Sequence, residues 1–493
     1  MLNMFESARK ERDKLASIIR AGAFGTTSEI EALRIIVQDF EQSHIRKEMI
    51  SGANYYLGKH DITKKMRTAI GPDGQPMVIA NLPNAHITDN QYAKAVDKKT
   101  AFLLSKPFVI KSDNEPYSEL LNQVLGAKFQ LLLQDAGTDA HNSGIAYLYP
   151  YVDEDGSLSI EVFSGHEFCP SWSDKRHEML ENGAHIYPVE TYVNGSKTIV
   201  KHVDWYCEEG VYRFVQSQNG ALVRDAENPF SPYFSVGDSG FYWGKLPIIP
   251  VKLNSLEVPL IHRVKSLQDA YNTMISLFVD NMQEDFRNTI LVIENYDGEN
   301  LGEFRRNLST YGAVKVRSDA NGHAGVSALH IEVNAENYES ITQLLKRAIL
   351  DNANSIDAKD ERLSSGTPNE MNIQAMYDDI SLDADKFEAQ IRVSFEKLIF
   401  FVNRYLETKG YGNFDKEDVT ITFNRNLPNI ISQTIENINN SVGIVSNRTL
   451  LAHHPFVDDV DKELEQLEKE RNESDPYAHA FEKASGDGNG TEE

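Results

Sequence analysis

The sequence has little cysteine and no long apolar run. Its two cysteines, Cys169 and Cys207, exclude a disulfide framework and a zinc site of the Cys-x-x-Cys kind, so we interpret both as small buried side chains or inert thiols. No stretch reaches about 18 apolar residues, and no helix is therefore expected to cross a membrane. The stretch MLNMFESARKERDKLASIIRAG is charged and lacks the apolar core of a signal peptide. We expect a cytoplasmic protein that is not secreted by that route.

Positive charge is also scarce. The chain of 493 residues carries 49 Lys and Arg against 74 Asp and Glu, a formal net charge of −25. Proteins that grip DNA tightly neutralise its phosphates with basic side chains, whereas most of this surface would repel them. Contact with nucleic acid is therefore expected to be local, weak or sliding. The hydrophobic content of 41% is that of a soluble globular protein, and the length predicts two to four domains.

Motifs of catalytic sites are incomplete. GDSG at 237–240 resembles a protease nucleophile loop but lies in a turn-rich stretch without the two-barrel pattern or the disulfides. GANYYLGKH at 52–60 has five residues between its glycines, and His follows its Lys, so the phosphate-loop pattern is not met. DEDG at 153–156 lacks the closing glutamate of a calcium loop, and the histidines of HHP at 453–455 point apart on a helix. We expect no enzyme activity, cofactor or metal.

The first half of the chain changes from a helical pattern to a strand pattern. Residues 1 to about 125 read mainly as helix, and a further helix is expected at about 126–143. From 144 to 252 apolar and polar residues alternate, and the pairs Asn194-Gly195 and Asn219-Gly220 are typical of hairpin turns. This stretch predicts an antiparallel meander.

Helical spacing returns after Pro259. Strands are predicted in TILVIENYDG and YGAVKVRSD, with the helix LGEFRRNL between them, and a helix capped by Asn334 follows. The longest predicted helix runs from Ile373 to Lys409 and stops at Gly410. DVTITFNRNLP predicts a strand, and the C-terminal stretch predicts an acidic helix with a disordered tail. The mixture predicts the α+β class.

A short polar loop separates the last two long helices. The stretch ERLSSGTPNE contains residues that break or cap helices. Read by itself, it is a surface connection between helices. Its Gly-Thr-Pro tip would also allow the loop to move without unfolding either neighbour.

The order of these elements resembles the portal proteins of tailed bacteriophages, in the family of long-tailed phages that infect Gram-positive hosts. The resemblance is carried by NYYLGKHDI, DKKTAFLLSKPF, HNSGIAYLYPYVDEDGSLSIEVFSGHEFCPSWSD, KLPIIPVKLN, SLQDAYNTMISLFVDNMQEDFRNTILVIENYDG and LLKRAILDNANSIDAKDERLSSGTPNEMNIQAMYDDISLDADKFE. It covers the chain from about residue 10 to about residue 470 and is specific in the order of these stretches, not in any short motif.

The resemblance implies a ring of about twelve subunits at one capsid vertex, with a channel through which double-stranded DNA is packaged and ejected. It implies a portal fold with a helical and β wing, a two-helix stem, a small α/β clip, a tunnel loop, a long wing helix and a short helical crown. The implied boundaries are 1–255 for the wing, 256–288 and 334–357 for the two stem helices, 289–333 for the clip, 358–372 for the tunnel loop, 373–430 for the long wing helix and wing strand, and 431–493 for the crown and acidic tail.

Three groups of residues are candidate sites under this resemblance. The tunnel loop would offer weak, sequence-blind phosphate contacts through Arg362, Leu363, Ser364, Ser365, Gly366, Thr367, Pro368 and Asn369. Lys265, Lys346 and Arg347 are candidate channel cations, with ion pairing between subunits as an equal alternative. Arg305 and Arg306, in the clip helix, are a candidate docking surface, with a solvated helix face as the alternative.

The implied partners are the large terminase subunit, the head-to-tail adaptor, the major capsid and scaffolding proteins, and DNA that passes through; no membrane is involved. The protein would lie at the portal vertex of the virion, and in the host cytoplasm during assembly. Two other classes stay open. A nuclease or packaging ATPase would need a phosphate loop and metal carboxylates, and a minor capsid or scaffold-type protein would have no DNA channel.

Overall fold

The computed structural model describes most of the chain. The described residues are 29–70, 74–78, 82–193, 196–217, 219–236, 239–284, 290–293, 326–329, 335–356, 370–425, 431–457 and 460–474. The clip arginines Arg305 and Arg306 and the tunnel-loop candidates 362–369 lie outside them. The chain divides into two compact units, one from residues 1–358 and 378–426 and one from residues 359–377 and 427–493.

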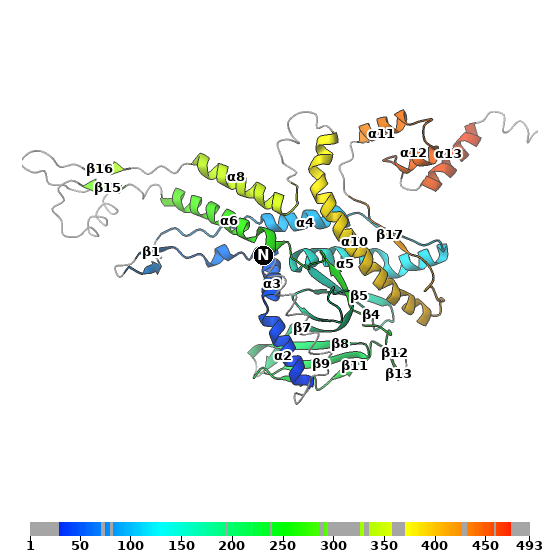
Figure 1. Ribbon diagram of the computed structural model, residues 1–493, viewed down its shortest axis with the longest axis horizontal. Coiled ribbons are helices and arrows are strands. Elements are labelled where there is room, and N and C mark those ends of the chain that lie inside the picture. The colour runs from blue at the N-terminus through cyan, green and yellow to red at the C-terminus, as the bar shows by residue number, and fades with distance from the viewer. Residues whose placement is uncertain are drawn as a thin grey trace, which may run out of the picture. The chain divides into compact units, whose positions relative to one another are not determined.

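Long helices dominate the larger unit (Figure 1). The α-helices are α2 (Glu29–Gln42), α3 (His44–Tyr56), α4 (Gln91–Leu104), α5 (Glu115–Ser143), α6 (Ile261–Glu284), α8 (Ala335–Asn352) and α10 (Glu370–Thr408). A short 3-10 helix, η1 (Asp61–Lys64), follows α3, and the start of α10 belongs to the smaller unit. Side-chain oxygens of Ser43, Asn90 and Asn114 cap α3, α4 and α5 by accepting from free N–H groups of the first turn. The helix expected from Ile373 to Lys409 is confirmed as α10.

Helix α5 combines the helix expected at about 126–143 with the helical stretch expected just before it. It begins at Glu115, behind the cap of Asn114. Gly126 interrupts its regular geometry with φ 57° and ψ −169°, a conformation that glycine adopts far more readily than other residues. This interruption falls where the sequence predicts the start of a further helix, so the expected division near residue 126 is confirmed. Gly144, with φ 79°, ends the helix.

The strands of residues 145–252 are antiparallel, as expected, but they form separate sheets. A three-stranded sheet has the order β14 (Ile249–Lys252), β4 (Ile145–Val152), β5 (Leu158–Ser164). A six-stranded sheet has the order β10 (Leu222–Arg224), β9 (Gly210–Gln216), β8 (Ser196–Cys207), β7 (Leu180–Val193), β6 (Phe168–Trp172), with β11 (Phe230–Ser231) also paired to β9. The smaller pairs are β1 (Thr68–Ile70) with β2 (Pro76–Val78), β3 (Val109–Lys111) with β17 (Thr420–Thr422), β12 (Phe234–Val236) with β13 (Ser239–Phe241), and β15 (Ile290–Ile293) with β16 (Val326–Leu329).

The single expected meander is divided at the tight connection between β5 and β6. A Cβ atom on Gly165 would lie 2.3 Å from the carbonyl oxygen of Ile145, so only glycine fits as the chain leaves the first sheet. In β7 and β8, Val193 lies opposite Ser196, which confirms the hairpin predicted between them. The strand in TILVIENYDG is confirmed as β15, but its partner β16 was not predicted.

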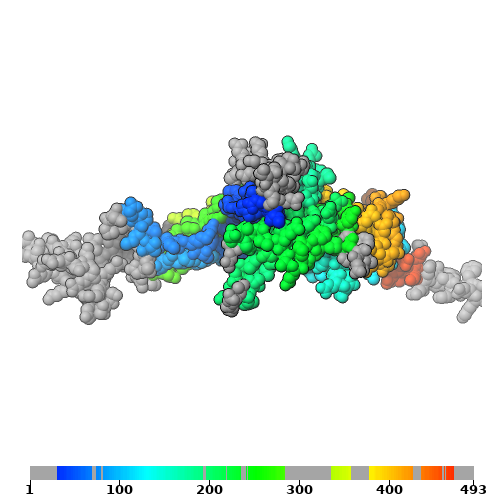
Figure 2. Space-filling model, turned by 90° about the horizontal axis from the view of Figure 1, so that it is seen from below, coloured from blue at the N-terminus to red at the C-terminus, as the bar shows by residue number. Residues whose placement is uncertain are grey.

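The main core lies between the long helices and the three-stranded sheet. On α10, Phe387, Ile391, Leu398 and Val402 are buried in this core, at the spacing of one face of a helix. A second core forms where α2 packs on the six-stranded sheet. Figure 2 shows helix α2, in dark blue, in contact with the green part of the chain. A third joins α3 and α4 to α6 and α8.

The smaller unit contains α11 (Ile431–Asn440), α12 (Asn447–Ala452), capped by Ser446, and α13 (Val460–Ser474). Among the described residues, none of the helices has the length and apolar content that a membrane span requires. The same residues hold no group of three or more His, Cys, Asp or Glu side chains placed to share a metal ion.

Candidate functional site: the α6–α8 pair and its attachment

Helices α6 and α8 project from the body as a pair (Figure 1). Near the far end, the ring of Tyr338 lies 5.1 Å from that of Phe278, centroid to centroid, and the Asn281 amide donates to the Tyr338 hydroxyl at 2.8 Å. Near the body, Leu345 and Ile349 of α8 pack with the third core. An apolar seam therefore holds the two helices together along their length.

A line of polar residues on α6 is buried, and the sequence analysis singled out none of them. Gln268, Asn272, Ser276 and Asp280 recur at every fourth position and are at most 1% exposed. Residues four apart share one face of a helix. The repeat of polar residues at this spacing is the sequence signal that would have revealed the line.

These side chains bind an extended segment of backbone, residues 84–90, which we call the strap. The strap is in neither helix nor sheet. The bonds run from the N–H of Ala85 to Asp280 Oδ1 (2.6 Å), from Ile87 to Ser276 Oγ (3.0 Å), from Asp89 to Asn272 Oδ1 (3.4 Å), and, just beyond the strap, from Tyr92 to Gln268 Oε1 (3.0 Å). Two extended residues advance about 6.6 Å and four helical residues about 6.0 Å, so the two repeats match. The helix thus gives the strap the partners that a neighbouring strand would supply.

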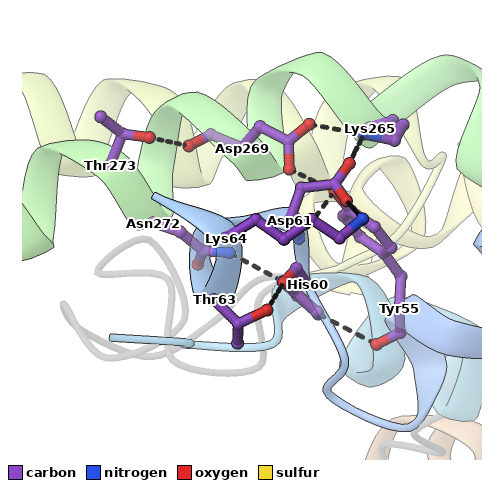
Figure 3. A network of polar contacts seen from close by, with 9 residues as sticks. All are labelled: Tyr55, His60, Asp61, Thr63, Lys64, Lys265, Asp269, Asn272 and Thr273. Carbon is purple, nitrogen blue, oxygen red and sulfur yellow. Dashed lines mark hydrogen bonds and ion pairs between the residues drawn. The ribbon is translucent and has the colours of Figure 1, made fainter. Parts of the chain in front are cut away.

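A charged cluster attaches the start of α6 to helix α3 and to η1 (Figure 3). Lys265 Nζ donates to Asp61 Oδ2 at 2.6 Å, to Asp269 Oδ2 at 2.8 Å and to the Tyr55 hydroxyl at 2.9 Å. Although partial burial opposes the charged form, these hydrogen bonds raise the pKa of Lys265. The hydrogen bond from Lys265 lowers the pKa of Asp61. Both groups are therefore charged at neutral pH.

Beside this cluster, a buried histidine links α3 to the polar line of α6. His60 Nε2 lies 3.0 Å from the carbonyl oxygen of Tyr55, and its Nδ1 lies 2.7 Å from the Asn272 amide nitrogen. A carbonyl only accepts and an amide NH₂ only donates, so Nε2 carries the proton and the ring is neutral. Burial lowers the pKa of His60, which agrees with that assignment.

Two adjacent lysines of α4 hold the other side of the helix pair. Lys98 donates to the carbonyl oxygen of Ile356. Lys99, 5% exposed, donates to the carbonyl oxygen of Ala353 at 2.9 Å and forms an ion pair with Asp383 of α10. The residues that follow α8 and an early turn of α10 are therefore fixed to the same helix.

The candidate channel cations have different surroundings. Lys265 is enclosed by carboxylates of its own chain, as described above. Lys346 and Arg347 lie on α8, where Lys346 is half-buried. Arg347 is exposed, and its Nε lies 3.9 Å from Asp351 Oδ2. Their role in a channel stays a prediction.

The incomplete catalytic motifs have structural explanations. Gly52 lies inside helix α3, and a Cβ there would lie 2.0 Å from the Asn142 carbonyl oxygen, so this glycine serves close packing. Asp153 closes the β4–β5 turn by accepting from the backbone and the hydroxyl of Ser157. In a phosphate loop, the first glycine belongs to a turn whose N–H groups surround the phosphate. Gly52 is inside a helix instead, so no such set of N–H groups is formed around it.

Comparisons with known proteins identify relatives of this chain. A sequence profile described as "Phage portal protein, SPP1 Gp6-like" matches residues 39–477. A portal protein of Bacillus phage SPP1 is 28% identical over 444 residues, 89% of this chain and 86% of that protein. A portal protein of Clostridium phage phiCD119 is 25% identical over 458 residues, 89% of this chain and 95% of that protein. A solved chain titled "Neck of native GTA particle computed with C12 symmetry" is 12% identical with a TM-score of 0.36, covering 74% of this chain and 89% of that one.

A match over most of the chain defines the class, which is that of the phage portal proteins, the connectors between head and tail. The chain belongs to the SPP1 Gp6-like family of phage portal proteins. The resemblance read from the sequence, including the relation to phages of Gram-positive hosts, is therefore confirmed.

Proposed function

We propose that copies of this chain assemble into a ring around a channel through which double-stranded DNA is packaged into the capsid and later ejected. The observation that carries this proposal is the attachment of the α6–α8 pair. The strap, the charged cluster at Lys265 and the lysines of α4 bind the pair from separate elements of the body. A helix pair held in this way can line a channel at a fixed angle. Apolar side chains that these helices leave exposed, Ile341 and Leu344 on α8 and Leu382 on α10, favour further packing between copies.

Each part of the chain would then form one region of the portal. Residues 1–255 and the long helix form the wing, α6 and α8 the stem, 289–333 the clip and 431–493 the crown. The partners would be the large terminase subunit, the head-to-tail adaptor, and the capsid and scaffolding proteins. The protein would assemble in the host cytoplasm and end at one vertex of the virion. A minor capsid role without a channel is the alternative.

Native mass spectrometry and images of the purified protein test the ring. We expect a closed oligomer of about twelve copies with an open axial channel, since head-to-tail contacts that close by rotation give rings. A stable monomer at micromolar concentration, or a closed particle without a channel, would contradict the proposal. The ring alone should not hydrolyse ATP, and turnover abolished by Lys59→Ala would show an enzyme instead.

The tunnel loop is the proposed point of contact with moving DNA. Gly366 and Pro368 disfavour continued helix by about 1 and up to about 3 kcal/mol relative to alanine. The variant with Gly366→Ala and Pro368→Ala should therefore extend the flanking helices and stiffen the loop. We expect rings and procapsids to form while packaging stops early. Normal packaging by this variant would make the loop a simple connection.

We also propose roles for the clip arginines, in docking, and for the channel cations, in contact with DNA. Changing Arg305 and Arg306 to Glu should leave the ring intact and weaken binding of terminase or adaptor. Arg176→Glu, on an arginine with an 83% exposed side chain in the wing, is the matched control. Unchanged binding would remove both arginines from the interface. Arg347, with a 74% exposed side chain, should contribute more to the channel than Lys265, which Asp61 and Asp269 of its own chain already neutralise. Equal effects of the two Ala substitutions on packaging would argue against this order.

A further inference from the structure

A groove of about 900 Å³ lies between helix α2 and the six-stranded sheet. Its lining combines polar and apolar side chains, and the apolar part consists of Ile30, Leu33 and Ile36 from α2 and Trp205, Tyr212 and Phe214 from strands β8 and β9. Trp205 and Tyr212 are only half-buried, and Tyr242, at the edge, is 61% exposed. This end of the second core therefore still has apolar surface in contact with solvent.

Acidic side chains border the same groove. Glu208 and Glu209, in the turn between β8 and β9, are exposed, and Glu181 of β7 also lines the groove. The guanidinium of Arg224 lies over the Tyr212 ring, 6.0 Å from its centroid. Apolar walls with an acidic border fit a peptide segment that carries both apolar and basic residues.

The sequence immediately before α2 has this composition. Residues 1–22 include five basic and three acidic residues, whereas the whole chain has 49 basic against 74 acidic residues. The same stretch contains Leu15, Ile18 and Ile19. It leads into Glu29, and the next residue, Ile30, already lines the groove.

We propose that the basic segment of residues 1–28 occupies the groove between α2 and the six-stranded sheet of its own copy. Its apolar residues would cover Trp205 and Tyr242, and its Arg and Lys side chains would lie near Glu208 and Glu209. To reach the groove, the segment would turn back at the start of α2. This interaction does not depend on ring formation, because every participant belongs to one copy.

A native thiol allows a direct test in the full-length chain. Cys207 lines the groove, and its Sγ donates to the Gly210 carbonyl oxygen at 3.3 Å. A cysteine introduced by Ser17→Cys should therefore form a disulfide with Cys207 within one copy under mild oxidation, detected by peptide mass spectrometry. Neither Ser17→Cys with Cys207→Ser nor Leu131→Cys, at a 62% exposed position of α5, should form this link. No link, or a link only between two copies, would overturn the proposal.

Charge reversal provides an independent test that leaves the thiols unchanged. Glu208→Lys with Glu209→Lys should expose Trp205 and increase its quenching by acrylamide, while Trp172 and Trp243, at 1% and 4% exposure, stay protected. Adding Arg9→Glu and Lys10→Glu should restore the protection. The matched control is Glu154→Lys with Asp155→Lys, in the β4–β5 turn. Equal quenching in all variants would show that the groove does not hold this segment.

Discussion

Replacing Lys99 by methionine tests whether one buried ammonium holds the end of α8 and an early turn of α10 together. Methionine keeps the unbranched shape of the side chain and is only one atom shorter, so it leaves no large cavity. The change removes the donor to Ala353 O, which lies 2.9 Å from Lys99 Nζ, and the partner of Asp383. Breaking a buried pair from one side costs about 3–5 kcal/mol. We expect about 3 kcal/mol, because the side chain of Asp383 is 24% exposed and keeps some contact with water.

Hydrogen exchange measures this loss where it occurs. The amides of Ala353, Asn354 and Ser355 donate within the turn that follows α8. A local loss of about 3 kcal/mol should accelerate their exchange by about two orders of magnitude, at 1.4 kcal/mol for each factor of ten. Lys94→Met, on the same helix, removes only the exposed pair with Asp89 and should change these amides little.

A double variant separates the charge from the packing. Replacing a whole buried ion pair by apolar residues is often close to neutral, so Lys99→Met with Asp383→Leu should recover most of the stability that Lys99→Met loses. In the native chain, burial opposes ionisation of Asp383, but Lys99 lowers its pKa overall. If Lys99→Met leaves the exchange of residues 353–355 within about twofold of the native rate, the ammonium does not anchor this turn.

Other predictions concern the strap and the dependence on pH. Asp280→Ala removes the acceptor of the Ala85 N–H and the ion-pair partner of Lys65. We expect this change to release the strap at a cost of about 3–5 kcal/mol, measured as rapid hydrogen exchange at the Ala85 amide. The control Asp351→Ala, at a side chain that is 70% exposed, should cost less than about 1 kcal/mol. Burial lowers the pKa of His141 and His185 to about 4, so the folded chain resists a proton that the unfolded chain binds below about pH 6.5. The free energy of unfolding should therefore fall by about 3 kcal/mol for each histidine as the pH decreases from 6.5 to 4. If the melting temperature of His185→Gln decreases with pH as steeply as that of the native chain, the contribution assigned to His185 is refuted.

Part of the candidate site was readable from the sequence. The helices of the pair, the long helix α10 and the class of protein followed from periodicity and from long stretches of resemblance, because apolar spacing is a local property that survives in one dimension. The buried polar line of α6 was missed. A Gln, Asn, Ser and Asp at every fourth position also describes a solvated helix face, and only the strap, almost 200 residues earlier in the chain, makes it a buried one.

The sequence by itself determined the acidic balance, the α+β class, the incomplete catalytic motifs and the membership of the portal family. Only the tertiary structure decided that Lys265 is held by Asp61 and Asp269, and that Lys99 joins the end of α8 to α10. It also placed one run of alternating strands in separate sheets, the first of which the chain leaves at Gly165. The physical reason is that charge partners and close backbone approaches depend on distances between segments remote in sequence, whereas composition and periodicity depend only on neighbours along the chain.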